Sequence, residues 1–150
     1  MIPLRQLPAL LILMAASALA AEVADPNVGV DTSTLPPIGA TVEGNPYRNL
    51  PAAIAIGREA YNQACARCHG IDGNHKGQVG LPLLRMDRAC GPIADPAIKA
   101  MCLRDNDDFF MKSVQNGKTR VGIVHMPAWK DILQPEAIWA IRSFLESRKR

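Results

Sequence analysis

Apolar residues recur at helical spacing in the second two thirds of the chain, and no segment gives a convincing β-type alternation. The first predicted helix runs from Pro51 to Ala66. Its apolar and small residues share one face: Ile54, Gly57, Tyr61 and Ala64. Proline suits the first position of a helix, and Asn49 is available as a cap before it.

Two further helices are predicted towards the C-terminus. One covers Asp107–Gln115, where Phe110 and Val114 share a face. Its boundary signals are Asp105 or Asn106 before it and Asn116-Gly117 after it. The other covers Pro135–Arg148, with Trp139 beside a core stripe of Ile138, Ile141 and Leu145. A shorter helix is expected over Asp95–Met101.

Residues 1–48 are organised differently. Residues 1–20 combine Arg5, an apolar run to Ala16 and the small-residue pattern Ala18-Leu19-Ala20, which predicts a secretory signal peptide cut after Ala20. An uncleaved membrane anchor is the alternative, but the run is shorter than the roughly 20 residues that a span needs. Residues 21–48, rich in proline and glycine, predict an irregular extension that lies on the domain or is partly mobile. The compact domain is predicted at residues 49–150.

Composition fits one small exported domain. Removing residues 1–20 leaves 130 of the 150 residues. Arg5 is the only charged residue removed, so the remaining 16 basic and 14 acidic side chains give a net charge of +2. That length can bury its own core. The charge gives no reason to expect nucleic acid as a partner. No second apolar run follows, so we expect a soluble periplasmic protein without stable membrane insertion.

The segment CARCHG carries the clearest chemistry. Cys65 and Cys68 lie three residues apart, and His69 follows the second cysteine directly. A haem is held covalently when two cysteines form thioethers with its vinyl groups, and the adjacent histidine can then bind the iron. This is the pattern of c-type haem attachment. The sequence therefore predicts one covalent haem c on Cys65 and Cys68, with His69 as an axial ligand.

Other uses of these cysteines find less support in the sequence. A thioredoxin-like redox pair would follow a strand in a βαβ pattern, and a zinc site would need a second close pair of cysteines or histidines. Neither pattern is present. A structural or assembly protein that uses the thiols alone remains an alternative, and it would give no haem stain.

Met126, in the segment VHMPAW, is the expected second axial ligand. It carries a thioether, lies between two predicted helices and precedes the stiffening Pro127. The other candidates are Met86, Met101, Met111, His75 and His125. Core packing would explain Met126 equally well in a protein without haem. If both axial positions are filled, no place remains for a substrate, and electron transfer is expected rather than catalysis.

The order of these features resembles a class I cytochrome c over residues 49–150. A CxxCH motif is followed by a capped helix that ends in Asn-Gly, a Met-Pro segment and an aromatic-bearing C-terminal helix. The resemblance implies an all-α fold of three to five helices around one covalent haem. It also implies that Gly57 and Tyr61 pack against Phe144, and that the backbone carbonyl of Pro82 orients the His69 ring.

Longer stretches are similar to one branch, the periplasmic cytochromes c-550 that serve quinoprotein (PQQ-dependent) alcohol dehydrogenases. They are NPYRNLPAAIAIGREAYNQACARCHG and VGIVHMPAW, together with the pair Cys90 and Cys102. The similarity implies such a dehydrogenase as electron donor and a downstream cytochrome or terminal oxidase as acceptor. The cysteine pair is left over after haem attachment in an exported protein, so a Cys90–Cys102 disulfide is expected, with two buried thiols as the alternative.

An electron carrier, not an enzyme, is thus the expected function. The alternative is a haem enzyme or sensor with an open or labile sixth position, either peroxidase-like or gas-binding, which would tend to lack the Met-Pro segment. Candidate pocket residues are Leu81, Leu83, Leu84, Ile123 and Trp129. Cations that could surround the haem edge, or be ordinary solvated charges, are Arg67, Lys76, Arg85, Lys118 and Lys130. The acidic cluster Asp105, Asp107 and Asp108 is interpreted as helix-start carboxylates.

Overall fold

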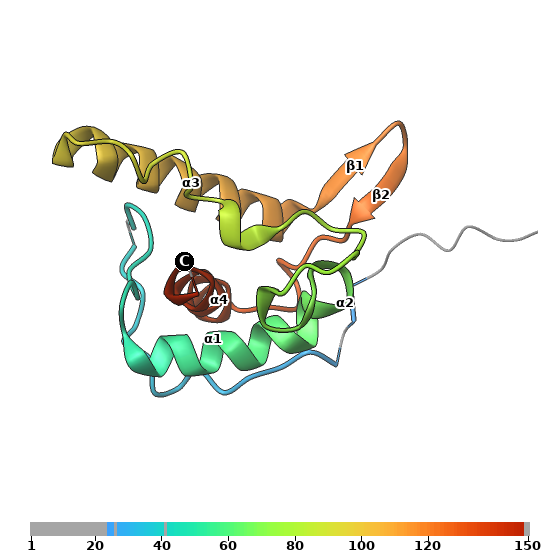
Figure 1. The fold of residues 1–150 in the computed structure, drawn as a ribbon. Coiled ribbons are helices and arrows are strands. Elements are labelled where there is room, and N and C mark those ends of the chain that lie inside the picture. Colours follow the sequence, from blue (N-terminus) through green and yellow to red (C-terminus); the bar gives the residue numbers. More distant parts are fainter. Residues whose placement is uncertain (1–23, 26, 41, 149–150) are drawn as a thin grey trace, which may run out of the picture.

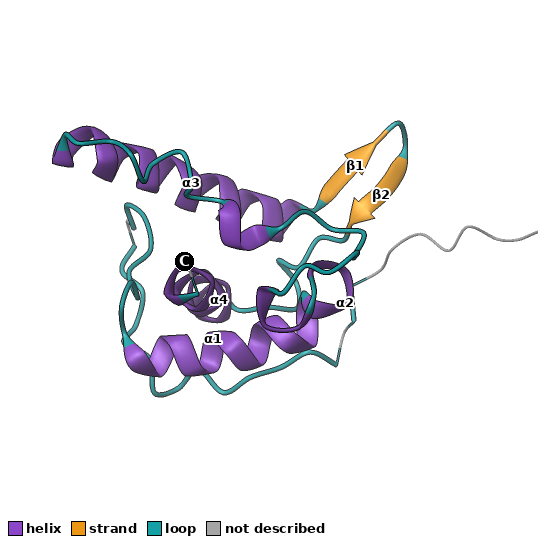
Figure 2. Cartoon of the chain, in the orientation of Figure 1, coloured by secondary structure: helices purple, strands orange, loops and turns teal. Residues whose placement is uncertain are grey.

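The computed structural model describes residues 24–25, 27–40 and 42–148, which form four α-helices, two 3-10 turns and one two-stranded antiparallel sheet (Figure 2). The α-helices are α1 (Pro51–Ala64), α2 (Ala66–His69), α3 (Pro96–Asn116) and α4 (Pro135–Ser147). The short elements are η1 (Ile71–Gly73), η2 (Leu83–Arg85), β1 (Lys118–Arg120) and β2 (Ile123–Met126). In Figure 1, α4 is seen end-on between α1 and α3. The predicted signal peptide, residues 1–20, lies outside the described residues.

Helices α1 and α4 cross at very close range. The small buried residues of α1 recur every three or four positions: Ala53, Gly57 and Ala60. A Cβ atom on Gly57 would lie 1.9 Å from the carbonyl oxygen of Ala140, so only glycine permits this approach. One turn further on, the rings of Tyr61 and Phe144 have centroids 5.4 Å apart. The contact expected between Gly57, Tyr61 and Phe144 is therefore present.

The described residues between 24 and 48 are irregular, as the composition of this extension indicated, and they lie on the domain. Leu35 and Tyr47 pack with Trp139 and Ala140 in an apolar cluster separate from the main core. The main core takes up the predicted stripe of Ile138, Ile141 and Leu145. Because both faces are covered, α4 is buried along almost its whole length. Among the described residues, no helix is both long and apolar enough to cross a membrane.

The predicted helix boundaries need correction in two places. The segments Asp95–Met101 and Asp107–Gln115 belong to one 21-residue helix, α3, because the charged residues between them, Arg104 and Asp105, face solvent without interrupting it. Asp95 caps this helix, accepting hydrogen bonds from two backbone N–H groups at 2.8 and 3.0 Å, so neither Asp105 nor Asn106 is the cap. Leu50, not Asn49, holds the cap position of α1, and no side chain caps that helix.

The β1–β2 hairpin was not predicted. Its turn places Val121 and Gly122 at φ +50° and +77°. Such turns are usually signalled by Asn-Gly or Asp-Gly, and a valine here hides the signal. Met126 consequently ends a strand instead of lying in an irregular loop.

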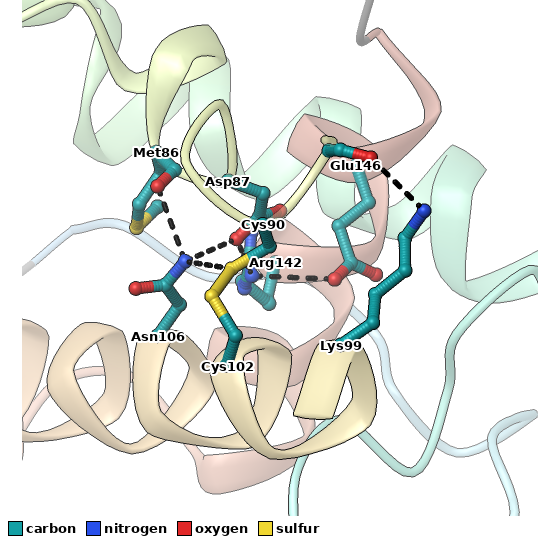
Figure 3. The surroundings of a disulfide bond; sticks show 9 residues. Met86, Asp87, Cys90, Lys99, Cys102, Asn106, Arg142 and Glu146 are labelled. Carbon is teal, nitrogen blue, oxygen red and sulfur yellow. Dashed lines mark hydrogen bonds and ion pairs between the residues drawn. A yellow bond between two sulfur atoms is a disulfide. The ribbon is translucent and has the colours of Figure 1, made fainter. Parts of the chain in front are cut away.

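A buried ion-pair network joins α4 to α3 and to the loop before α3. Figure 3 shows the part that links Arg142 to Asp87 in this loop. Arg142 is 0% exposed, and it donates hydrogen bonds of 2.7 Å to both Asp107 and Asp87. Burial opposes the charge of Arg142, but hydrogen bonding and attraction from the surrounding carboxylates outweigh burial and raise its pKa. Asp107, expected at a helix start with Asp105 and Asp108, is instead a buried partner of this arginine. Arg48 reaches the same carboxylate from the extension.

The structure joins Cys90 and Cys102 in a disulfide, with Cα atoms 5.8 Å apart (Figure 3). This is the pairing that the sequence led us to expect. The bond links the loop after η2 to α3. One turn along α3, the Asn106 amide donates to the backbone carbonyl of Met86 and, at 2.9 Å, to Asp87. The disulfide and the Arg142 network thus hold the same loop.

The α1–α4 crossing predicts that Gly57→Ala destabilises the protein, although glycine to alanine normally stabilises an exposed helix by about 1 kcal/mol. Here the added methyl group overlaps the Ala140 carbonyl, and overpacking of this kind costs about 1–3 kcal/mol. Urea unfolding followed by circular dichroism measures the loss. Gly39→Ala is the matched control, because nothing lies within 4 Å of its Cβ position. Equal stability of the two variants would contradict the close approach.

The buried network predicts different outcomes for two neighbouring aspartates of α3. Asp107→Ala leaves the buried Arg142 with an incomplete set of partners and is expected to lower the free energy of unfolding by about 3–5 kcal/mol. Asp105→Ala changes an exposed side chain, and its effect is expected within about 0.5 kcal/mol. Chemical denaturation of both variants measures the loss in the free energy of unfolding. A similarly small loss in both would contradict the role of Asp107 as a buried partner of Arg142.

Candidate haem site

The CxxCH motif forms one extra helical turn at the end of α1. Cys65 closes α1 with a hydrogen bond from its N–H to the Tyr61 carbonyl (2.8 Å), and its own carbonyl accepts from the N–H of His69 (2.9 Å). The Tyr61 hydroxyl donates to the Gly70 carbonyl at 3.0 Å. Burial raises the pKa of that hydroxyl, so it stays a donor. The motif is therefore held at both ends by one residue: the Tyr61 backbone carbonyl binds Cys65, the Tyr61 hydroxyl binds Gly70, and its ring packs against Phe144 on α4.

The environment of Cys65 does not suit thiol redox chemistry. Burial, and then the neighbouring Cys68, raise the pKa of Cys65 to about 12. A catalytic dithiol needs a lowered pKa, since the thiolate is the nucleophile. The described residues also contain no group of three or more histidine, cysteine or acidic side chains placed to hold a metal ion, so the second ligand pair of a zinc site is not found there.

His69 is oriented by a backbone carbonyl on the loop that follows the motif. Its Nδ1 lies 2.8 Å from the carbonyl oxygen of Leu81. A carbonyl can only accept, so Nδ1 carries the proton and the lone pair is on Nε2. Burial lowers the pKa of His69, which keeps the ring neutral at pH 7. A neutral imidazole with a fixed tautomer is the form that binds a metal.

The carbonyl that orients His69 belongs to Leu81, whereas the resemblance implied Pro82. The Pro82 carbonyl accepts instead from the N–H of Arg85 (3.2 Å) and closes the η2 turn. The expected interaction is thus displaced by one residue, because the turn takes up the proline carbonyl.

The loop is pressed onto the motif at Gly80. A Cβ atom on Gly80 would lie 2.5 Å from Nδ1 of His69, and the Gly80 N–H donates to the Cys68 carbonyl at 2.7 Å. His75, a candidate ligand, has its Nε2 hydrogen-bonded to the Gly80 carbonyl within this loop. At position 80 the loop therefore leaves no room for a side chain beside the His69 ring.

The start of the same loop is anchored by residues that sequence reasoning missed. Arg58 donates two hydrogen bonds of 2.8 Å to Asp72, and Asn62 donates a third of 2.9 Å. These hydrogen bonds lower the pKa of Asp72 and keep it ionised, and those from Arg58 have the largest effect. Asp72 has φ +55°, a left-handed conformation that this anchoring holds in place. The one available signal was the four-residue spacing of Arg58 and Asn62 on α1.

Strand β2 places Met126 and His125 in different environments. Along the strand Ile123 and His125 are exposed, whereas Val124 and Met126 are half-buried. Lys118 pairs with Met126, and Thr119 pairs with Val124. His125 therefore has no partner on β1 and is the extra residue of a β-bulge. Met126 packs against the main core. Among the other methionines, Met101 is 52% exposed on α3, whereas Met86 and Met111 pack against the core.

The residues around the motif fit an apolar macrocycle. Leu81, whose carbonyl orients His69, has a side chain that is 77% exposed, and Val79 beside it is 92% exposed. Large apolar side chains left in solvent beside a binding motif indicate a surface that a ligand covers. Of the remaining pocket candidates, Ile123 is 59% exposed, Trp129 is buried, and Leu83 and Leu84 pack against the core. All five candidate cations are exposed: Arg67, Lys76, Arg85, Lys118 and Lys130.

Comparison with known proteins identifies the family. The family model described as cytochrome c oxidase, cbb3-type, subunit III matches residues 52–145. Cytochrome c550 of Pseudomonas aeruginosa is 39% identical over 123 residues, covering 79% of this chain and 74% of that protein. No solved structure matches the chain significantly. The matched region contains the CxxCH motif, the 80–81 loop and Met126, and the chain belongs to the class I c-type cytochromes of the c-550 kind, electron-transport proteins that bind haem c covalently.

Proposed function

We propose that this cytochrome is a periplasmic electron carrier whose haem iron is held by His69 and Met126. Its donor is a quinoprotein alcohol dehydrogenase, and its acceptor is a downstream cytochrome or a terminal oxidase. The observation that carries the axial assignment is the Leu81 carbonyl on Nδ1 of His69, which leaves Nε2 as the only ring nitrogen able to bind iron. Met126 is supported by its inward, half-buried position on β2.

The protein's part in electron transfer is to hold the haem and its two axial ligands in fixed positions. Haem c supplies the one-electron exchange between ferrous and ferric iron. Cys65 and Cys68 attach it through a helical turn that α1 and Tyr61 hold rigid. His69 donates a nitrogen whose basicity the Leu81 carbonyl increases. The Met126 thioether favours the reduced iron and so raises the reduction potential.

The choice of donor is supported by the long stretches that resemble the c-550 branch and by the exposed cations. The cations lie within the motif (Arg67), in the loops after it (Lys76), in η2 (Arg85), on β1 (Lys118) and after the Met-Pro segment (Lys130). Positive charge around a haem edge steers an acidic partner towards it and raises the association rate.

The axial assignment predicts opposite outcomes for two adjacent variants. The oxidised protein is expected to show the weak red absorption band of a sulfur–iron bond. Met126→Ala should abolish this band and let cyanide or carbon monoxide bind the iron. His125→Ala, one residue earlier on the exposed side of β2, should leave both properties unchanged.

A band that survives in Met126→Ala would disprove this ligand. Variants of the two other core-packed methionines, Met86→Leu and Met111→Leu, then identify the sulfur donor. A wild-type protein that lacks the band and binds carbon monoxide directly would favour the haem enzyme or sensor.

The donor assignment predicts fast reduction by a quinoprotein alcohol dehydrogenase in stopped-flow experiments. The second-order rate constant should fall with ionic strength, because charges on the two surfaces are screened over about 10 Å at 0.1 M salt. Arg67→Gln and Lys130→Gln should lower it, whereas Arg104→Gln on the exposed side of α3 serves as the control. The net charge of residues 21–150 is only +2, so the salt effect should be modest.

Quick reduction by another donor, with none by any such dehydrogenase, would retain the electron carrier and discard the alcohol pathway.

A further inference from the structure

We propose that the β1–β2 hairpin is a docking element, and that Val121 at its tip enters an apolar recess surrounded by acidic side chains on the protein that exchanges electrons with this cytochrome. The inference rests on the proposed function as an electron carrier. Figure 1 shows the hairpin projecting beyond the end of α3, away from the α1–α4 pair.

The hairpin tip, Val121 and Gly122, has features that do not stabilise the fold. Val121 is 100% exposed and adopts φ +50°, a conformation unfavourable for a β-branched residue. Nothing lies within 4 Å of the Cβ position of Gly122 beside it. Backbone strain and an apolar side chain in water are both unfavourable, and no contact among the described residues offsets them. Asparagine at this turn position would remove both penalties, so the valine is explained by a contact outside the chain.

The base of the hairpin, by contrast, is rigidly held. A Cβ atom on Gly117 would lie 2.4 Å from the Met126 carbonyl oxygen, so the two strands meet tightly where α3 ends. The ammonium group of Lys118 lies 4.4 Å from the centre of the Phe109 ring on α3. Lys118 is also the register partner of Met126. A contact at the tip is therefore held at a fixed position relative to the proposed iron ligand.

The charge of the hairpin specifies its partner. Residues 117–130 contain three cations, Lys118, Arg120 and Lys130, and no aspartate or glutamate. All of β1 is exposed, and Ile123 on β2 is 59% exposed beside the tip. An apolar centre with a rim of one sign matches a recess of opposite sign, which is the usual anatomy of a protein interface.

The same features describe an anionic membrane surface less well. Segments that insert into the membrane interface present tryptophan, phenylalanine or leucine, whereas the hairpin from Lys118 to Met126 contains no aromatic residue and no leucine. Its tip offers one valine and one isoleucine. We therefore assign it to a protein partner.

The test is Val121→Asn in the haem-loaded protein, measured by stopped flow with a quinoprotein alcohol dehydrogenase as donor. The second-order rate constant is expected to fall by about tenfold, the effect of losing one buried valine contact. Reduction by ascorbate should be unchanged, and the thermal midpoint unchanged or higher, because asparagine relieves the turn. Ile98→Asn is the matched control, since it removes an apolar side chain that is 54% exposed near the other end of α3. It should leave the rate unaffected. Arg120→Gln should reduce the salt dependence.

Oxidation by membranes that contain a terminal oxidase is measured with the same variants as a second arm. If the dehydrogenase does not reduce the wild type, the donor assignment fails, and the oxidase arm alone decides the hairpin. Equal rates for Val121→Asn and wild type in every arm where the wild type is active overturn the proposal. Sedimentation of wild type, but not of Val121→Asn, with phosphatidylglycerol vesicles, at unchanged transfer rates, would replace it with membrane contact. A wild type inactive in both arms overturns the proposed donor and acceptor, and the hairpin proposal with them.

Discussion

The close approach of α1 and α4 at Gly57 is the constraint on which the haem site depends. Because the Ala140 backbone occupies the space of a side chain at Gly57, the two helices have one relative position. That position brings Tyr61 against Phe144 and directs its hydroxyl to the Gly70 carbonyl. Gly70 ends the turn that carries Cys65, Cys68 and His69. The motif is thus positioned by backbone packing two turns earlier, and the Leu81 carbonyl then fixes the ring.

The second half of the site depends on α3, which does not pack against α1 in the same way. Its position is determined by a buried arginine: Arg142 holds Asp107 on α3 and Asp87 in the preceding loop, and the Cys90–Cys102 disulfide joins these two segments covalently. A buried ion pair adds little net stability, since desolvation offsets most of the attraction, but a mispaired one is very unfavourable. Such a network discriminates against wrong arrangements of α3, whose end carries the hairpin and Met126.

The sequence predicted best those features that depend on residues close together along the chain. The haem motif, the end of α3 at Gly117 and the start of α4 at Pro135 depend on residues adjacent in sequence, and the structure places them where expected. The tertiary features were harder. Asp107 was taken for a helix start because its partner is 35 residues away, although a signal existed: Arg142 lies within the stripe formed by Ile138, Ile141 and Leu145. The hairpin was missed because Val121 occupies a turn position where asparagine or glycine is usual. No sequence pattern distinguishes the carbonyl of Leu81 from that of Pro82.

The two proposed axial ligands are consequently carried by different parts of the chain. His69 is held by α1, α2 and the loop to Leu81, whereas Met126 is held by α3 and the hairpin, and α4 packs between these two halves (Figure 1). Each ligand has its own rigid support, so neither depends on the iron for its local conformation. The tip of the hairpin, its base and Met126 form one continuous unit. If both proposals hold, a partner that binds Val121 contacts the same structural unit that carries the proposed methionine ligand.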